Sequence, residues 1–584
     1  MKPPKNEKKT GAQVLVDVLN EKKVPYVFGH TGGAVIPIHV EFNRRMKAKE
    51  KTPYFMMFRQ EAGAGHAAEG YAAVSGKVAV ALGTSGPGAT NLVTPIADAY
   101  ADSLPVVFLT GQTASANIGN DSFQEVDTIG VTRPITKWNY LVKSADDLGP
   151  ALRSAFHIAA TGRPGPVLVD ICVDALLNST TNADGTFVHK GYRPNVRMNK
   201  KQADALLEAL LAAERPVIIA GAGVEGSGGA REFIEFIEKY NIPVVLTLRA
   251  LGTVPHEHPR YIGMPGMHGS APANFTLRDA DFIFSVGARL DDRIAVKNFE
   301  QGKKIAHIDI DPVEIGKKFK TFYPLAACAL DFFKHANKRE IAKRRDISDW
   351  LTRIDGWKQA HPLTTEPSET RLQPQYLVAE ISRLTKDDAT IASGVGQHQM
   401  WAAQYYRFRR PRQWVSSCGL GSMGYGLPAA IGAYLANPKK PVVLIDGDGS
   451  FQMNLQELGT VVQHRMPIKI FILNNSYLGM VRQWEERFFE GYHYECCLGR
   501  SADCPPECTE GCDTPTLNPD FAGLAHIYPG LVSKRVTAAV EVAGALQAAL
   551  KHKGPYLIDF IIRRDEDVLP MIPAGKGLGD MILR

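Results

Sequence analysis

Val442-Val443-Leu444-Ile445-Asp446-Gly447-Asp448-Gly449-Ser450 is the stretch of sequence that decides the fold. It reads as a buried strand that runs straight into a glycine-flanked aspartate. A second apolar run, Ile468 to Leu473, ends in the same way at Asn474-Asn475. Apolar strands that alternate with helical stretches belong to parallel sheets covered on both faces. We therefore predict a doubly wound α/β block, with Asp448 and Asn475 at the carboxyl edge of its sheet, where ligands bind.

The same alternation of strands and helices occurs in two earlier parts of the chain. The 584 residues suggest three or four domains at about 150 residues each. We expect three doubly wound parallel-sheet domains, over 10–175, 196–340 and 371–565. A polar stretch at 175–195 and a charged stretch at 334–370 are the expected connections.

Composition and charge exclude several classes of protein. The 67 Lys and Arg exceed the 61 Asp and Glu by only 6, and no basic patch predicts nucleic-acid binding. No apolar run resembles a signal peptide or a membrane span, so we expect a cytoplasmic protein with no membrane partner. Three of the eight cysteines are scattered, but five fall between Cys496 and Cys512.

Asp448 and Asn475 have the chemistry of a magnesium site. A carboxylate and an amide oxygen are hard ligands suited to Mg²⁺, which completes its coordination with phosphate oxygens and water. Gly447 and Gly449 would let backbone N–H groups approach a diphosphate at a helix N-terminus. The alternative is a tight turn with a capping aspartate. The pairing with Asn474-Asn475 instead resembles the thiamine-diphosphate binding motif.

Thiamine diphosphate requires a carboxylate beside its aminopyrimidine ring, because that ring must take the proton from C2. Glu61 meets this requirement in the first block. It follows the predicted strand Tyr54 to Phe58 and precedes the small residues Ala62 to Gly65. An isolated glutamate at the start of a helix is otherwise a helix cap.

Longer motifs identify a family. The chain resembles the catalytic subunit of acetohydroxyacid synthase (acetolactate synthase), a thiamine-diphosphate-dependent enzyme, over nearly all of residues 10 to 575. The matching stretches are Thr84 to Gly111, Phe123-Gln124-Glu125, Gly162 to Val167, Gly266-Met267-His268-Gly269, Asp291-Asp292-Arg293, His307 to Pro312, Val395 to Trp401, Gly421 to Gly426 and Val568 to Pro573.

The resemblance implies roles for residues at the reaction centre. Glu61 would activate the cofactor, with Phe123 and Gln124 near the reacting carbons. Asp448, Asn475 and the backbone of Tyr477 would hold Mg²⁺. Three of the implied substrate residues also have a purely structural interpretation: Lys137 as an exposed lysine, Arg293 as a salt-bridged arginine and Trp484 as a core tryptophan. The implied substrate residues are Gly33, Ala34, Lys137, Arg293 and Trp484, and the implied thiamine-diphosphate residues are Gly396, Gln397, His398, Gly421, Met423, Gly447, Gly449, Ser450, Gly479 and Met480.

The middle block resembles the FAD domain of the same family, in which the flavin is structural. A Gly-Ala-Gly turn alone is weak evidence, since any dinucleotide-like turn supplies one. The residues that match flavin-contacting positions are Arg163, Gly221, Gly223, Thr247, Leu248, Met267, His268, Gly269, Arg289, Asp309 and Asp331.

Two features depart from the family. His30-Thr31 stands where the family has an aromatic residue and proline beside the substrate pocket, which bears on the choice of acceptor. The segment from Cys496 to Cys512 lies where the family has a mobile loop. Cys504, Cys508 and Cys512 are spaced so that they could hold Zn²⁺ or an Fe–S cluster with Cys496, Cys497 or His493. Surface thiols in a loose insertion are the preferred interpretation, because the spacing matches no standard signature.

The family implies a transferase reaction (EC 2.2.1.6). Pyruvate is decarboxylated and its hydroxyethyl unit is joined to a second 2-oxoacid, pyruvate or 2-oxobutyrate, in valine, leucine and isoleucine biosynthesis. We expect a homodimer or homotetramer, because Glu61 and Asp448 would meet across an interface, and a separate regulatory subunit is a candidate partner. The alternatives are another thiamine-diphosphate/FAD carboligase, a pyruvate oxidase, or a non-catalytic nucleotide-binding protein.

Overall fold

The computed structural model describes residues 8–194, 196–294, 296–340, 345–365, 367, 371–500 and 517–583. The chain forms two compact units. The first contains residues 1–195, 417–439 and 453–468, and the second contains 196–416, 440–452 and 469–584. The expected boundaries 10–175, 196–340 and 371–565 stay predictions.

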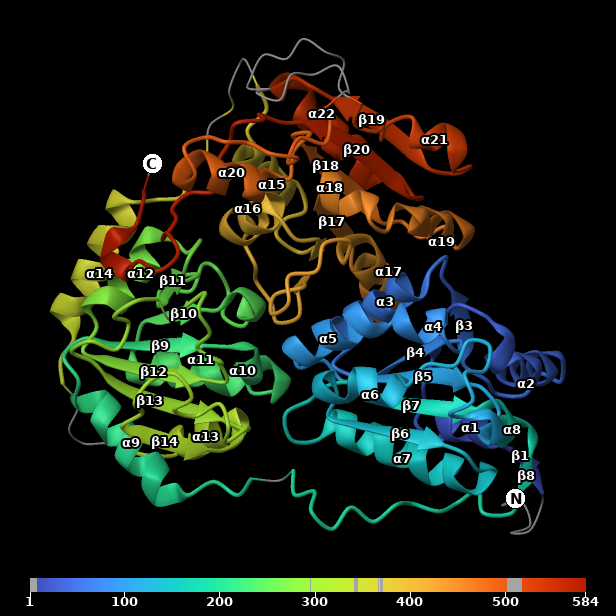
Figure 1. Cartoon of the computed structure of the whole chain (residues 1–584). Helices are drawn as coiled ribbons and strands as arrows, with labels where there is room; N and C mark the ends of the chain where they lie inside the picture. The colour runs from blue at the N-terminus through green and yellow to red at the C-terminus, as the bar shows by residue number, and fades with distance from the viewer. Residues whose placement is uncertain are drawn as a thin grey trace. The chain divides into compact units, whose positions relative to one another are not determined.

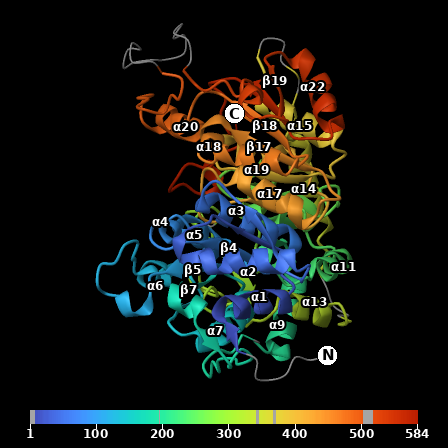
Figure 2. The ribbon, with the colours of Figure 1, turned by 90° about the vertical axis from the view of Figure 1, so that its right-hand side faces the viewer.

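The first unit is built on a six-stranded parallel sheet in the order β3-β2-β4-β5-β7-β6. Figures 1 and 2 show α3 and α5 on one face of this sheet and α1 and α7 on the other. The strands are β2 (Tyr26–Gly29), β3 (Tyr54–Met57), β4 (Ala79–Gly83), β5 (Val106–Gln112), β6 (Trp138–Val142) and β7 (Val167–Cys172), and the main helices are α1 (Gly11–Glu21), α2 (Ile36–Lys47), α3 (Glu61–Ser75), α5 (Val93–Ala101) and α7 (Ala145–Ala160).

Small residues in α3 allow a second helix to pack directly on it. In α17 (Gly426–Ala436), a Cβ added to Gly432 would lie 1.9 Å from the carbonyl oxygen of Ala67. A Cβ added to Gly70 would lie 2.2 Å from the carbonyl oxygen of Ala429. The two backbones are therefore in direct contact, and neither glycine can be replaced without moving a helix.

The second unit begins with a six-stranded parallel sheet in the order β11-β10-β9-β12-β13-β14. This is the strand order of the dinucleotide-binding Rossmann fold, which binds its ligand where the order reverses, between β9 and β12. The strands are β9 (Pro216–Ala220), β10 (Val244–Leu246), β11 (Tyr261–Gly263), β12 (Phe282–Val286), β13 (Lys304–Asp309) and β14 (Tyr323–Ala326), with helices α9 (Lys200–Ala212), α10 (Ala222–Gly226), α11 (Ala230–Tyr240), α12 (Ala271–Asp279), α13 (Ala329–Ala336) and α14 (Ser348–Ala360).

The third sheet, also in the second unit, has the order β16-β15-β17-β18-β20-β19. When strands are counted along the chain within each sheet, this order is the same as in the first sheet. The strands are β15 (Thr390–Ser393), β16 (Trp414–Ser416), β17 (Val442–Gly447), β18 (Lys469–Asn474), β19 (Val532–Val536) and β20 (Tyr556–Ile561), with helices α15 (Pro374–Leu384), α16 (Gln397–Tyr405), α18 (Asp448–Gln452), α20 (Gly479–Phe488) and α22 (Ala539–Lys551).

The predicted fold class is confirmed, because three six-stranded sheets, each parallel throughout, carry helices on their faces. Their cores are the apolar strands that the sequence indicated, such as Val442 to Ile445, all fully or nearly fully buried. Among the described helices, none combines the length and the apolar character needed to cross a bilayer.

Candidate active site

The carboxyl ends of β15, β17 and β18 bring together the residues predicted to bind diphosphate and metal. Asp448 begins α18 directly after β17, and Asn475 follows β18. The strand order reverses between β15 and β17, so this edge is the position at which parallel sheets bind ligands.

Asp448 is held in an enclosed, polar setting. Its side chain is 1% exposed, and its Oδ2 accepts a hydrogen bond of 2.7 Å from Asn518 Nδ2, which also donates to Asn474 Oδ1. Burial raises the pKa of Asp448 to about 7, although the bond from Asn518 opposes this shift. A buried carboxylate of this kind is stabilised in its ionised form by a bound cation.

Asn475 is oriented by its neighbours. Its Oδ1 accepts the N–H of Tyr477 at 3.0 Å, and its Nδ2 donates to Gln397 Oε1 at 3.3 Å. A Cβ on Gly479 would lie 2.1 Å from the same Gln397 oxygen. The glycine therefore permits a close approach that no other residue allows.

The turn that precedes Asp448 and the turn that follows β15 are equally crowded. A Cβ on Gly447 would meet the His398 ring at 2.5 Å, and one on Gly394 would meet Ser450 Oγ at 2.0 Å. His398 Nε2 lies 3.1 Å from Asp446 Oδ1. The predicted residues Gly396, Gln397, His398, Gly447, Gly449 and Ser450 thus gather at one sheet edge, with Gly479 and Met480 at the start of α20.

Glu61 lies in the first unit at the N-terminus of α3, as predicted. Its Oε2 accepts a hydrogen bond of 3.0 Å from Asn91 Nδ2. The start of the helix is fixed by Glu457, whose Oε1 accepts the N–H groups of Arg59 at 3.0 Å and Gln60 at 3.2 Å. Burial raises the pKa of Glu457 to about 7, against the lowering effect of these bonds and of the Thr460 hydroxyl.

The other predicted residues of the first unit line the carboxyl ends of β2 and β4. Ala34 N–H donates to Thr84 Oγ1 at 3.3 Å, directly after Gly33. Gln124 adopts a left-handed backbone conformation (φ 60°) against Gly86, and Phe123 is 89% exposed. His30, the residue that departs from the family, places Nδ1 2.8 Å from the carbonyl oxygen of Phe58.

Gly421 and Met423 lie in the segment between β16 and α17. The N–H of Gly421 donates to Ser417 Oγ at 2.9 Å, and Met423 is half-buried. Their predicted contact with the cofactor stays a prediction.

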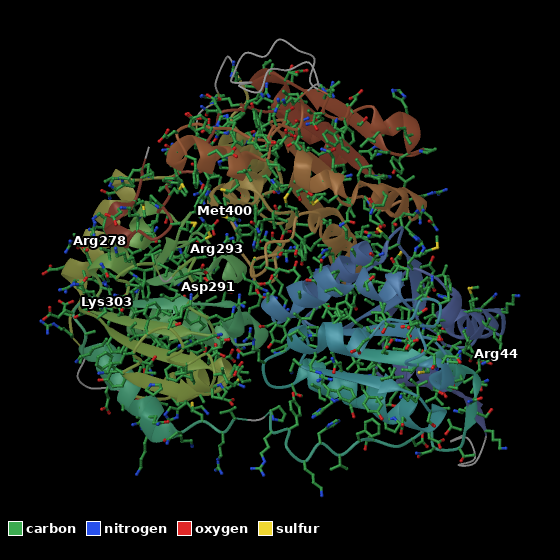
Figure 3. All side chains as sticks on the ribbon, viewed as in Figure 1. Arg44, Arg278, Asp291, Arg293, Lys303 and Met400 are labelled. Carbon is green, nitrogen blue, oxygen red and sulfur yellow. The ribbon has the colours of Figure 1, made fainter. Side chains whose placement is uncertain are left out.

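The predicted substrate residues Lys137, Arg293 and Trp484 differ in their exposure and in the contacts that they make. Lys137 Nζ donates to the carbonyls of Ile158 and Thr161, so it anchors α7 and its contacts do not favour a substrate role. Arg293 is exposed on the segment after β12, where Figure 3 shows it close to Asp291. Trp484 is half-buried on α20 and contacts Phe488 at 5.5 Å between ring centroids.

Gly221 and Gly223, two of the predicted flavin residues, follow β9, where the strand order of the middle sheet reverses. A Cβ on Gly221 would lie 2.1 Å from the carbonyl oxygen of Gly287, and one on Gly223 would lie 2.7 Å from its Cα, so the turns after β9 and β12 pack backbone to backbone. His268 is buried, and burial followed by the charge of Arg293 lowers its pKa to about 4. The other predicted flavin residues of this unit are Thr247 and Leu248 after β10, Met267 and Gly269 beside His268, Arg289 after β12, Asp309 at the end of β13 and Asp331 in α13.

Arg163 lies in the first unit, where its Nε donates to Ser103 Oγ at 2.9 Å. Its predicted flavin contact stays a prediction.

Sequence reasoning missed three polar residues that hold predicted ones. Asn91 bonds Glu61, Glu457 fixes the start of α3, and Asn518 bonds Asp448. Asn91 was visible in the glycine-rich loop after β4, but the other two come from parts of the sequence with no signature of their own.

Of the residues considered as metal ligands in the cysteine-rich segment, the structure describes only Cys496, Cys497 and His493. Cys504, Cys508 and Cys512 lie outside the described residues. Burial raises the pKa of the Cys496 thiol to about 12, and Cys497 Sγ accepts a hydrogen bond of 3.4 Å from Arg564. His493 Nε2 lies 2.9 Å from Glu486 Oε2.

Comparison with known proteins defines the class of the chain. Three models of thiamine pyrophosphate enzymes match it in order: the N-terminal TPP binding domain at residues 9–131, the central domain at 203–335, and the C-terminal TPP binding domain at 394–560. These ranges include the whole middle sheet and most strands of the other two, so the chain is built as a thiamine pyrophosphate enzyme.

Individual relatives narrow the family. The chain is 43% identical to acetolactate synthase 1 of Zea mays, over 98% of the chain and 88% of that protein. It is 42% identical to the acetolactate synthase large subunit of Corynebacterium glutamicum, over 98% and 90%, and 41% identical to that of Lactococcus lactis, over 100% and 98%. The chain belongs to the acetolactate synthase family.

Proposed function

We propose that this protein is a thiamine-diphosphate-dependent acetolactate synthase. It decarboxylates pyruvate and joins the hydroxyethyl unit to a second 2-oxoacid, as a step in branched-chain amino acid biosynthesis. The observation that carries the proposal is the retention of Glu61 after β3 of the first sheet and of Asp448 and Asn475 at the carboxyl edge of the third, all three buried. The nearly full-length similarity to acetolactate synthases supports it.

The residues present fit thiamine diphosphate and Mg²⁺. Asp448, Asn475 and the backbone of Tyr477 would hold the metal, and the glycines at 447 and 479 let His398 and Gln397 pack directly against the backbone beside these ligands. When bound, thiamine diphosphate supplies a nucleophilic carbon and an electron sink for the two-carbon unit. Glu61 then holds or releases a proton at the aminopyrimidine, and Asn91 keeps its carboxylate oriented through Oε2.

FAD is the proposed second cofactor, and the middle sheet fits it. Its strand order is that of dinucleotide-binding folds, and the Gly221–Gly223 turn lies at the point of reversal. Asp309, at the end of β13, is positioned to accept hydrogen bonds from a ligand at this edge.

We further propose a homodimer or homotetramer. Glu61 belongs to one compact unit and Asp448 to the other, and a shared active site between subunits would bring such residues together. A separate regulatory subunit is a candidate partner, because two of the relatives are named large subunits. A cytoplasmic location agrees with the described cysteines, all of which are free.

The decisive experiment measures acetolactate from pyruvate, with and without 2-oxobutyrate, in the presence of thiamine diphosphate, Mg²⁺ and FAD. We expect acetolactate from pyruvate alone and 2-aceto-2-hydroxybutyrate when 2-oxobutyrate is added. Glu61→Gln should fold and bind cofactor but lose activity by about 10²-fold or more. Oxygen consumption with pyruvate, without acetolactate, would instead identify a pyruvate oxidase.

A further inference from the structure

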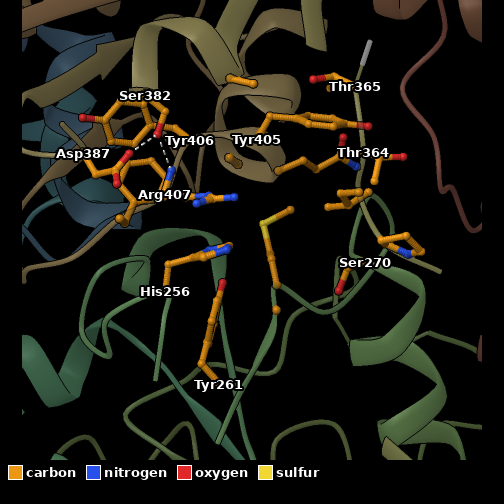
Figure 4. Close-up of a pocket in the computed structure, with 18 of the residues that line it drawn as sticks. His256, Tyr261, Ser270, Thr364, Thr365, Ser382, Asp387, Tyr405, Tyr406 and Arg407 are labelled. Carbon is orange, nitrogen blue, oxygen red and sulfur yellow. Dashed lines mark hydrogen bonds between the residues drawn. The ribbon is translucent and has the colours of Figure 1, made fainter. Parts of the chain in front are cut away.

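A cavity of about 610 Å³ lies within the second unit. It is bounded by β11 and the segments beside it, by the end of α14, and by α15 and the end of α16 (Figure 4). None of the residues assigned above to thiamine diphosphate, Mg²⁺ or flavin lines it. Its volume is within the range of small-molecule sites.

The charge of the cavity is positive. Among the described residues, Arg407 and Lys358 line it and form no ion pair, and Lys358 Nζ donates to the carbonyl oxygen of Tyr261 at 3.3 Å. The two acidic residues that line it are already neutralised: Glu380 pairs with Arg383 at 2.7 Å, and Asp387 pairs with Arg409 at 3.0 Å.

His256 is a further basic residue in the wall of the cavity. Its ring faces the cavity beside the Arg407 guanidinium, as Figure 4 shows. Enclosure by protein, followed by the charge of Arg407, lowers the pKa of His256, and the charges of Glu257 and Asp387 oppose this shift. Enclosed cations such as Arg407 and Lys358 are stabilised by an anion.

Polar groups in the cavity wall also lack partners. Within the described structure, Ser270 Oγ and Gln404 Oε1 have no hydrogen-bond partner, although these residues are only 7% and 8% exposed. Buried polar atoms are nearly always satisfied, so an unsatisfied pair in one cavity indicates a missing ligand or water. The hydroxyls of Thr364 and Thr365 line the same space.

Aromatic rings form much of the remaining wall. The rings of His256 and Tyr261 meet edge to face at 5.7 Å, and those of Tyr406 and Phe408 lie 5.0 Å apart. Tyr405 adds a further ring (Figure 4). Such walls favour a planar ring, which they contact by stacking or edge-to-face packing.

We propose that this cavity binds a phosphorylated compound with a planar ring, such as a nucleoside phosphate, with its phosphate against Arg407 and Lys358 and its ring against the tyrosines. Phosphate matches the planar fork of arginine and the point charge of lysine. The cavity shares no lining residue with the predicted flavin site, and Gln404 joins the two through a hydrogen bond of 2.9 Å from its Nε2 to the carbonyl oxygen of His268.

The test is calorimetric titration of the holoenzyme, loaded with thiamine diphosphate, Mg²⁺ and FAD, with ADP, adenosine and inorganic phosphate. We expect ADP to bind more tightly than either fragment, without release of flavin. Arg407→Gln and Lys358→Gln should each weaken ADP binding by about tenfold or more, the effect of losing a charge-assisted contact. Arg231→Gln, which removes the same charge at an exposed position on α11, should leave ADP binding unchanged.

Several results would overturn the proposal. The first is that ADP does not bind at millimolar concentration, and the second is that ADP and inorganic phosphate bind with equal affinity. The others are that ADP releases the flavin, or that both cavity variants bind ADP with the affinity of wild type. The flavin absorbance and acetolactate formation of each variant show whether it is folded. The proposed reaction is thereby tested separately from the cavity.

Discussion

The hydroxyl of Ser417 donates a hydrogen bond of 2.9 Å to Asp98 Oδ1 and also accepts the N–H groups of Gly421 and Ser422, each at 2.9 Å. Ser417 is 1% exposed and Asp98 is fully buried. One hydroxyl therefore ties the segment that carries Gly421 and Met423 to α5. Burial, followed by the charges of Glu69 and Asp102, raises the pKa of Asp98 well above its usual value.

Ser417→Ala should weaken thiamine-diphosphate binding. The change removes the hydrogen bond between this segment and Asp98 and leaves the N–H groups of Gly421 and Ser422 without this acceptor, which costs about 1–3 kcal/mol of unfolding free energy. We expect a higher thiamine-diphosphate concentration for half-maximal activity, with turnover partly restored at saturation. Activity titrations and urea unfolding measure both effects.

Two further variants control this prediction. Asp98→Asn keeps an oxygen that can accept from Ser417, so it should retain cofactor affinity. Ser422→Ala removes a buried hydroxyl that has no partner within the described structure, and should change stability by no more than about 0.5 kcal/mol. Unchanged cofactor affinity in Ser417→Ala would refute the positioning role.

Glu457 should act on Glu61 through the start of α3. Glu457→Ala deprives the N–H groups of Arg59 and Gln60 of their acceptor and should lower turnover and stability, the latter by about 1–3 kcal/mol. Glu457→Gln keeps an acceptor oxygen in the same place and should retain activity. Steady-state kinetics of the two variants distinguish them.

The same pair gives a pH-dependent result. The pKa of Glu457 is raised from 4.5 to about 7, so its contribution to stability is complete below pH 4.5 and is lost as the pH rises through 7. Glutamine does not titrate. The stability of Glu457→Gln relative to wild type should therefore rise between these two pH values and then level off, in unfolding measured across that range. A difference that stays flat with pH would contradict the assigned environment.

The strands that could be predicted from sequence are mostly those buried on both faces. The apolar runs that begin at Val442 and at Ile468 were predicted as strands and correspond to β17 and β18, because continuous apolar runs indicate interior strands of parallel sheets. The strands that were not predicted include five at sheet edges: β6, β11, β14, β16 and β19. An edge strand such as Val532–Val536 contains Ser533, Lys534 and Arg535, so it carries no apolar run.

Some residues of the candidate site could likewise be predicted from the sequence, and others could not. Asp448, Asn475 and Glu61 are found from sequence because each follows a strand and stands in a local motif. Their partners cannot be found so, since Glu457 and Asn518 reach Arg59 and Asp448 only after folding brings distant segments together. The contacts of Lys137 with the backbone carbonyls of Ile158 and Thr161 could not be predicted from the sequence either, and its substrate role stays a prediction.

The cysteine-rich segment should contain no metal. The spacing of its cysteines matches no standard metal-binding signature. Burial and then Glu485 raise the pKa of the Cys496 thiol, so a metal at this residue would have to displace its proton. We expect no zinc or iron in the purified protein, and full activity once Mg²⁺ is restored after chelation. Serine variants at Cys504, Cys508 and Cys512 should also remain active. Stoichiometric zinc or iron that is lost in these variants would reverse the interpretation.

Asn518 should tune the affinity of the metal site through Asp448. Its Nδ2 holds Asp448 Oδ2 at 2.7 Å and Asn474 Oδ1 at 3.0 Å, and so orients the carboxylate without occupying its other oxygen. Residues that orient a metal ligand commonly contribute 10- to 100-fold in affinity. We expect Asn518→Ala to raise the Mg²⁺ concentration for half-maximal activity by about tenfold or more, with turnover recovered at saturating Mg²⁺. Asn178→Ala, at an exposed position in the first unit, is the matched control and should behave as wild type. If Asn518→Ala lowered turnover at every Mg²⁺ concentration by the same factor, the residue would act on the reaction itself rather than on the metal.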